Sequence, residues 1–210
     1  MIEKELPLFP LNLVAYPGEE LNLHIFEPRY RQLITECVNT NTTFGVPSYV
    51  LSKIEYGTEV KIVKLEKTYD DGRMDVRTVG MGIFKVLDFV SPWPGKLYSG
   101  GTVEMIKTDH DGDVVLQEEL FKLANDLFEW LGMEGLVKFD QKMLTYTIAH
   151  KIGLSKEQEY ELLKTTSEKK RQKFLINYLK LTIPIVKQME QAKDRIRQNG
   201  HFKHLDALDF

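Results

Sequence analysis

The spacing of apolar residues divides the chain into two parts with different periods. Up to about residue 106, short runs of Val, Ile, Phe and Tyr alternate with turn residues, which is typical of β-strands. We expect strands over residues 21–26, 58–69, 74–79, 84–90 and 101–106. Asp70-Asp71-Gly72 separates the second strand from the third, and Asp-Gly is a preferred two-residue hairpin turn. These two strands should therefore form a β-hairpin.

One helix should interrupt the strands. Pro28 suits a first helical position, because proline lacks the backbone N–H that would have no partner there. Apolar residues then recur at helical spacing, namely Tyr30, Leu33, Ile34, Cys37 and Val38. We therefore expect the chain to enter a helix at this proline.

From about residue 114 the apolar period changes to about 3.6 residues, so the second part should be helical. We expect helices over 116–131 and 143–152, and a third that begins at Ser155, because Ser155 followed by Gln158 is a capping-box signature. A last helix over 167–198 would be ~48 Å long at 1.5 Å per residue. Pro184 lies inside it, and we expect a kink or break near Leu181.

The last helix carries a heptad-like row of residues: Tyr178, Thr182, Ile185, Met189, Ala192 and Ile196. Either the chain's own helices or a second copy must cover such a row. We expect the chain's own helices, with self-association through the C-terminal helix as the alternative. The chain thus divides into a strand-rich part with one helix over 1–106, a helical part over 114–199 and a C-terminal tail over 200–210.

The charge balance argues against a nucleic-acid or membrane partner. The 210 residues include 28 Lys and Arg against 31 Asp and Glu, a net charge of −3, so no global positive field attracts nucleic acid or anionic lipid. No stretch reaches the ~20 apolar residues that span a bilayer, and the N-terminus lacks a signal-peptide pattern.

The only cysteine, Cys37, excludes an intrachain disulfide and suits a reducing compartment. We expect a cytoplasmic protein.

Catalytic motifs are absent from the sequence. It contains no phosphate-binding loop, no Gly-x-Ser-x-Gly and no His-Glu-x-x-His. Gly80-Met81-Gly82 fails as a dinucleotide fingerprint, because Lys85 stands where the third glycine should be. Cys37 lies on an apolar helical face and is expected to be buried rather than nucleophilic. We therefore expect no enzyme, no cofactor and no metal site.

Two charged segments could have either a binding role or a purely structural one. Asp109, Asp111 and Asp113 alternate like calcium ligands, but Leu120 stands at the twelfth position, where a calcium loop needs Glu. We expect a solvated turn there. The run 168–173 is basic, and we expect it to be an exposed helix face rather than a contact for nucleic acid.

The N-terminal motifs resemble the Lon protease N-terminal (LON substrate-binding) domain family. The similarity rests on Leu6-Pro7-Leu8-Phe9-Pro10-Leu11, Tyr16-Pro17-Gly18 and Leu21-Asn22-Leu23-His24-Ile25-Phe26-Glu27-Pro28-Arg29-Tyr30, and on matching residues up to about 106. Two departures are Tyr16, where phenylalanine is usual, and Ile83, where arginine is frequent. The resemblance implies an α+β fold, a PUA-like pseudo β-barrel followed by an α-helical bundle with a long C-terminal helix.

The resemblance also implies a function. In full-length Lon proteases this region precedes an ATPase module and a serine–lysine peptidase module, and it helps to engage damaged or unfolded substrates. Neither module occurs in this sequence. The implied function is a non-catalytic binding module for exposed apolar or unfolded polypeptide segments. The alternatives are an RNA-binding PUA-like module and an adaptor to a dedicated protein partner.

Within the motifs, the residue types favour mainly structural roles. Proline fixes φ near −65°, so prolines direct the chain around the sheet, and Gly18 would supply the turn before the next strand. Glu27 and Arg29 should form an ion pair, with contact to a ligand as the alternative. The motif residues with expected structural roles are Pro10, Pro17, Gly18, Phe26, Glu27, Arg29 and Tyr30.

Four aromatic residues are candidate substrate contacts. Trp93 and Tyr98 lie in or beside a loop rich in proline and glycine, and Tyr16 and Tyr49 are further candidates. Apolar burial of ~25 cal/mol per Å² would drive binding, and edge strands would be available for backbone pairing. The alternative for Trp93 is packing over the end of the barrel.

Overall fold

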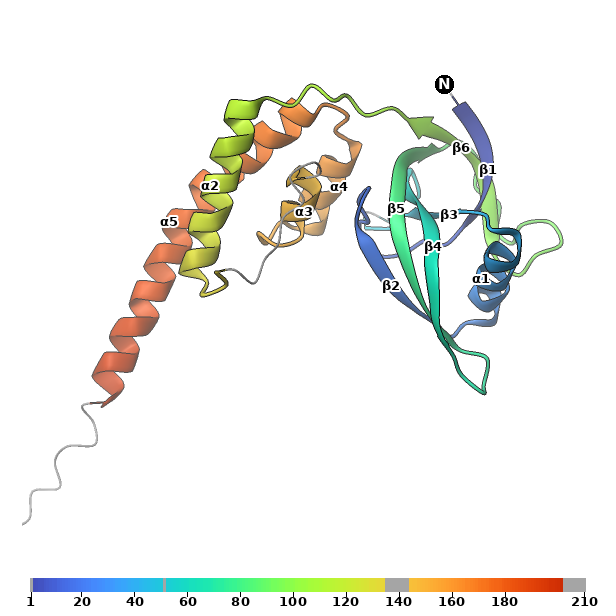
Figure 1. Cartoon of the computed structure of the whole chain (residues 1–210), viewed down its shortest axis with the longest axis horizontal. Helices are drawn as coiled ribbons and strands as arrows, with labels where there is room; N and C mark the ends of the chain where they lie inside the picture. The colour runs from blue at the N-terminus through green and yellow to red at the C-terminus, as the bar shows by residue number, and fades with distance from the viewer. Residues whose placement is uncertain (1, 51, 135–143, 202–210) are drawn as a thin grey trace, which may run out of the picture.

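A computed structural model of the chain describes residues 2–50, 52–134 and 144–201, with side chains up to residue 197. It shows a β-barrel with one attached helix and, beside it, a group of four helices (Figure 1). An extended linker over 107–113 joins the two parts. None of the described helices is long and apolar enough to cross a membrane.

The barrel is a closed ring of five strands with a sixth strand attached. The ring consists of β1 (Ile2–Leu8), β3 (Phe44–Pro47), β4 (Tyr56–Thr68), β5 (Met74–Val86) and β6 (Ser99–Ile106), and pairing of β5 with β6 closes it. Among the described strands, the sixth strand, β2 (Glu20–Ile25), pairs only with β5. The helix α1 (Pro28–Thr40) begins at Pro28 as predicted and buries Tyr30, Leu33, Ile34 and Cys37 against the sheet.

The strand predictions were right in part. The hairpin of β4 and β5 is confirmed. Tyr69 N–H donates to the Arg73 carbonyl at 2.9 Å, and the three residues that this bond encloses, 70–72, form the turn in place of the expected two. Gly72 lies in this loop with φ of +82°. The sequence pattern missed β1 and β3. The expected separate strands over 74–79 and 84–90 are wrong, since β5 is continuous and ends at Val86.

Gly80, at the middle of β5, has a packing role and does not end the strand. β5 pairs with β2 up to Val79 and with β6 from Ile83 on, so it changes partner near Gly80. A Cβ at Gly80 would lie 2.1 Å from the Tyr16 carbonyl oxygen. Glycine is therefore needed because another backbone crosses the strand there, and it does not interrupt the strand.

The described residues of the second part form four helices: α2 (Val114–Trp130), α3 (Leu144–Ala149), α4 (Lys156–Lys164) and α5 (Glu168–His201). The capping box of Ser155 and Gln158 at α4 is confirmed. A break near Leu181 is wrong, because α5 continues through Pro184 over 34 residues. Ile183, next to this proline, is buried in the core that α2 and α5 share. That packing compensates for the backbone donor that Pro184 lacks.

The packed face of α5 differs from the predicted row. Leu175, Leu179 and Ile183 are buried, whereas Ile185, Met189 and Ile196 are 58%, 55% and 71% exposed. The expectation that the chain's own helices cover these three residues is wrong. The reason is length: α2 has 17 residues and runs beside only the first half of α5, so α5 extends beyond its end (Figure 1).

Candidate functional site

Tyr16 joins the barrel to the helices. It is 0% exposed, and its ring stacks on Tyr146 of α3 with 4.9 Å between the ring centroids. Its hydroxyl donates to the Glu159 carbonyl of α4 at 2.9 Å. Burial, and then the charge of Glu159, raises the pKa of the Tyr16 hydroxyl, so it stays a donor. Tyr16 is therefore a structural contact between the two parts of the chain and is not accessible at the surface.

His150 forms a second link beside Tyr16. Its Nδ1 lies 2.7 Å from Glu159 Oε1 in α4, and its Nε2 lies 3.1 Å from Glu19 Oε2 in the barrel part. Burial lowers the pKa of the ring, but hydrogen bonds and charges from Glu19 and then Glu159 outweigh burial and raise it to about 9. The protonated ring thus donates to both carboxylates at neutral pH.

His150→Gln is expected to remove a pH-dependent contribution to stability. The folded-state pKa of about 9 lies above the ordinary value of 6.5, so the contribution is complete below pH 6.5 and is lost as the pH rises towards 9. The wild-type chain should exceed the variant in free energy of unfolding by about 1–2 kcal/mol at pH 6, with solvent screening allowed for, and by less at pH 9.5.

Urea denaturation followed by circular dichroism at the two pH values measures this difference. His110→Gln in the linker is the matched control, because His110 has no described hydrogen bond or ion pair. A wild-type advantage that is equal at both pH values would contradict the prediction.

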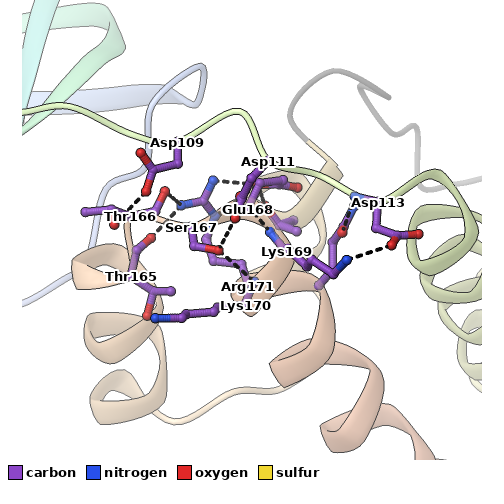
Figure 2. Close-up of polar contacts among 12 residues, drawn as sticks. Asp109, Asp111, Asp113, Thr165, Thr166, Ser167, Glu168, Lys169, Lys170 and Arg171 are labelled. Atoms are coloured by element: carbon purple, nitrogen blue, oxygen red, sulfur yellow. Dashed lines mark hydrogen bonds and ion pairs between the residues drawn. The ribbon is translucent and has the colours of Figure 1, made fainter.

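The linker over 107–113 is held along the N-terminal end of α5 (Figure 2). Asp111 Oδ1 accepts from the Lys169 backbone N–H at 3.1 Å, and Asp111 Oδ2 accepts from Ser167 Oγ at 2.6 Å. The hydroxyl of Ser167 and then the Lys169 amide lower the pKa of the Asp111 carboxyl. Residues 109–112 are exposed, as expected, but they form part of an extended linker rather than a turn, because the unpaired N–H groups at the start of α5 require acceptors and the linker supplies them.

Asp113 completes this attachment. Its side chain caps α2 by accepting from the backbone N–H of Val115 and Leu116, and it forms an ion pair with Lys169 at 2.9 Å. Asp113 thus contacts both α2 and α5, two helices that are far apart in the sequence.

Arg171 organises the start of α5 and the end of α4. Its side chain is 4% exposed and donates to Glu168, to the carbonyls of Thr165 and Thr166, and to Thr145 of α3 (Figure 2). The guanidinium also lies over the Tyr146 ring, 4.6 Å from its centroid. The expectation that 168–173 is an exposed basic face is therefore wrong for Arg171, because the carbonyls that follow α4 need a buried donor.

The loop between β5 and β6 forms an open pocket against α1. The pocket has a volume of about 420 Å³ and is lined by Gln32, Pro92, Trp93, Pro94, Gly95, Lys96 and Leu97. Trp93 packs over Gly100, where a Cβ would lie 2.2 Å from its ring, and it is partly buried against the core between α1 and the sheet. Leu97 is 61% exposed. Gln32 Oε1 accepts from the Leu97 backbone N–H at 2.9 Å and thereby holds the loop on α1.

The structure separates the other candidate contacts. Tyr98 is adjacent to Trp93 but is 2% exposed, and its hydroxyl donates to Glu36. Tyr49 is 45% exposed and lies apart from this pocket, with its backbone N–H bonded to the Leu11 carbonyl. Only Trp93 and Tyr49 among the four therefore remain partly accessible. Leu97 and Gln32 were missed, and the available signal for Leu97 was its position three residues after Pro94, in the loop that carries Trp93.

The motif residues with expected structural roles lie near the start of β2 and α1. Gly18 has φ of +78°, and its N–H donates to the Gly80 carbonyl at 2.9 Å. Tyr30 stacks on Phe9, and Arg29 pairs with Glu27 at 2.8 Å on the surface. Phe26 is 61% exposed. Pro17 is buried and Pro10 is partly buried.

Among the described residues, no group of three or more His, Cys, Asp or Glu side chains is placed to hold a metal ion. The candidate site has two parts. One is the apolar loop between β5 and β6 that lies on α1, and the other is the junction between the barrel and the helices, which polar contacts hold together. Such an arrangement can bind a partner through apolar burial and hydrogen bonds.

Comparison with known proteins gives consistent matches. The model of the ATP-dependent protease La (LON) substrate-binding domain family matches residues 5–180. A LON peptidase N-terminal domain and RING finger protein of Schizosaccharomyces pombe is 30% identical over 41% of this chain. The matched region is 22% of that protein's length, so this chain corresponds to about a fifth of it.

Two solved structures share the fold. A Lon N-terminal domain protein from Xanthomonas campestris is 29% identical, with a TM-score of 0.65 over 83% of this chain and 98% of that one. The N-terminal domain of the Mycobacterium avium complex Lon protease has a TM-score of 0.68 over 84% of this chain and 98% of that one, at 14% identity. The barrel followed by helices is thus a known arrangement.

Proposed function

This chain belongs to the ATP-dependent protease La (LON) substrate-binding domain family, and we propose that it is a non-catalytic module that binds exposed apolar or unfolded polypeptide segments. The match over 5–180 is to a substrate-binding domain, and no protease or ATPase domain is found in the 210 residues. The observation that carries the proposal is the exposed Leu97 in a pocket beside Trp93. An apolar client side chain placed there would be removed from water, which is favourable.

Two other functions remain as alternatives. The relative from Schizosaccharomyces pombe is named for a LON domain and a RING finger, which supports an adaptor to a dedicated partner. An RNA-binding module is disfavoured by the net charge of −3, and steep salt dependence of binding to structured RNA would support it.

The exposed row of Ile185, Met189 and Ile196 supports self-association, which stays a prediction. A cytoplasmic location also stays a proposal, supported by the single buried Cys37.

A titration with folded and unfolded forms of one protein tests the proposed function. Native α-lactalbumin and its reduced, carboxymethylated form, which stays unfolded, are labelled and followed by fluorescence anisotropy. We expect binding of the unfolded form and negligible binding of the native form. Equal, negligible binding of both forms would contradict the proposed function.

Leu97→Asp is expected to weaken binding of the unfolded form about tenfold, because a charge in the pocket must be desolvated when an apolar segment docks. Leu87→Asp is the matched control, since Leu87 is 47% exposed but does not line this pocket. It should change the dissociation constant less than about twofold. Equal effects of the two variants would show that the pocket is not the contact surface.

A further inference from the structure

The sheet has three stretches of strand edge that no other described strand covers. One is the outer edge of β2, which pairs only with β5. The second is residues 61–68 of β4, because β3 pairs with β4 only up to Val60. The third is residues 2–7 of β1, which pairs with β3 only at Leu8 and contains Lys4 and Pro7, residue types that blunt an edge. An uncovered edge presents backbone N–H and C=O groups to another chain, and proteins usually blunt such edges.

The β4 edge is blunted. Its pairing with β5 shifts register between Ile62 and Lys64 and again between Leu65 and Lys67. Exposed lysines occur at 61, 64 and 67, and the end of α1 lies beside residues 61–65. Bulges and lysines are both devices that prevent another strand from pairing.

The β2 edge carries none of these devices. Its pairing with β5 runs from Glu20 opposite Val79 to Ile25 opposite Met74 without a register shift, and the strand contains no lysine and no proline. The Leu21 carbonyl faces β5, since it accepts from Thr78 Oγ1 at 2.9 Å. Because bonding alternates along an antiparallel strand, the backbone groups of Glu20, Asn22 and His24 point outward. No hydrogen bond among the described residues uses them.

The surroundings of this edge define what it would bind. On the barrel side, Leu21 and Leu23 are partly exposed and offer apolar contacts. At the start of the strand, Glu20 is exposed and lines a cavity of about 290 Å³ together with Glu19, Tyr146, His150 and Lys151. The two carboxylates of this cavity, Glu19 and Glu20, lie with two cationic groups, His150 and Lys151, so the cavity sets no charge preference for a bound segment. The row of outward backbone groups requires a partner with an extended backbone.

We propose that the outer edge of β2 binds an extended segment of an unfolded client polypeptide as an added β-strand. The segment places apolar side chains against Leu21 and Leu23. This inference rests on the proposed function and deepens it, because it names the backbone conformation and the side-chain pattern of the bound segment.

Asn22→Pro tests the proposal. The ring removes the outward N–H of residue 22 and leaves the bonds between β2 and β5 in place, which is the setting in which an edge strand tolerates proline. Binding of reduced, carboxymethylated α-lactalbumin should weaken about tenfold. Asn22→Thr is the matched control, because it keeps the N–H and a strand-compatible side chain, and it should change binding less than about twofold.

Amide hydrogen exchange by NMR gives a readout on the unmutated chain. Adding the unfolded probe should slow exchange at Asn22 and His24, whose N–H groups point outward. Exchange at Leu21 and Leu23 should stay unchanged, because their N–H groups already face β5. This alternation is expected only for an added strand, and it keeps the test valid if Asn22→Pro fails to fold.

The outcomes separate this proposal from the proposed function. No binding of the probe to the wild-type chain overturns both. Binding without alternating protection at β2 overturns the β2 proposal and leaves the proposed function standing. A dimer of the free chain, measured by light scattering and dissociated by Asn22→Pro, identifies a second copy as the occupant and also overturns the proposal. Weakened binding together with alternating protection supports it.

Discussion

Arg171→Met is expected to lower the free energy of unfolding by about 3–5 kcal/mol, because removing one partner of a buried ion pair leaves the other uncompensated. Arg171 is 4% exposed and is the donor to Glu168 and to the Thr165 and Thr166 carbonyls. Methionine fills a similar volume but donates no hydrogen bond. Both carbonyls would then lose this buried donor, so the end of α4 and the start of α5 should loosen together.

Urea denaturation followed by circular dichroism measures this loss. Lys170→Met is the matched control, since it makes the same kind of substitution one residue earlier at an exposed position. The control should change the free energy of unfolding by no more than about 0.5 kcal/mol. A similar small effect of Arg171→Met would show that the buried contacts around Arg171 contribute little to stability.

Gly80→Ala is expected to lower the free energy of unfolding by about 3 kcal/mol, at the upper end for inserting one extra carbon into a packed region. The new Cβ would lie 2.1 Å from the Tyr16 carbonyl oxygen and 3.2 Å from Pro17 Cα. Both are backbone atoms, so no side-chain rotation relieves the overlap. Residues 16–18 would have to move, and the Gly18 bond to the Gly80 carbonyl would weaken.

Gly82→Ala, two residues later in the same strand, is the control. A Cβ there meets Met105 Cε at 3.3 Å, and the end of a methionine can shift. This variant should stay within about 1 kcal/mol of the wild-type chain in thermal or urea unfolding. Equal destabilisation by the two variants would contradict the assignment of a specific backbone crossing at Gly80.

The sequence located part of the candidate site. It placed Trp93 in a loop between strands, and this residue lines the pocket on α1. It also singled out Tyr16 and Tyr98, whose rings are 0% and 2% exposed. A tyrosine near proline or glycine in the sequence has the same local pattern whether its ring is covered or free. Burial depends on α3 for Tyr16 and on α1 for Tyr98, and both helices are distant in the sequence.

Features that depend on a few neighbouring residues were determined by the sequence alone. Pro28 begins α1, Ser155 and Gln158 cap α4, and the change of apolar period separates strands from helices. In each case the interacting groups are within about four residues of one another, so their spacing along the chain specifies their geometry.

Tertiary structure alone decided which of these elements are covered. It buried Arg171, left Ile185 and Ile196 exposed beyond the end of α2, and left the outer edge of β2 without a neighbour among the described strands. It also brought the Tyr16 carbonyl against Gly80. These outcomes depend on the lengths and positions of segments far apart in the chain. Local spacing carries no information on such distances, because solvent exposure is a property of the assembled surface.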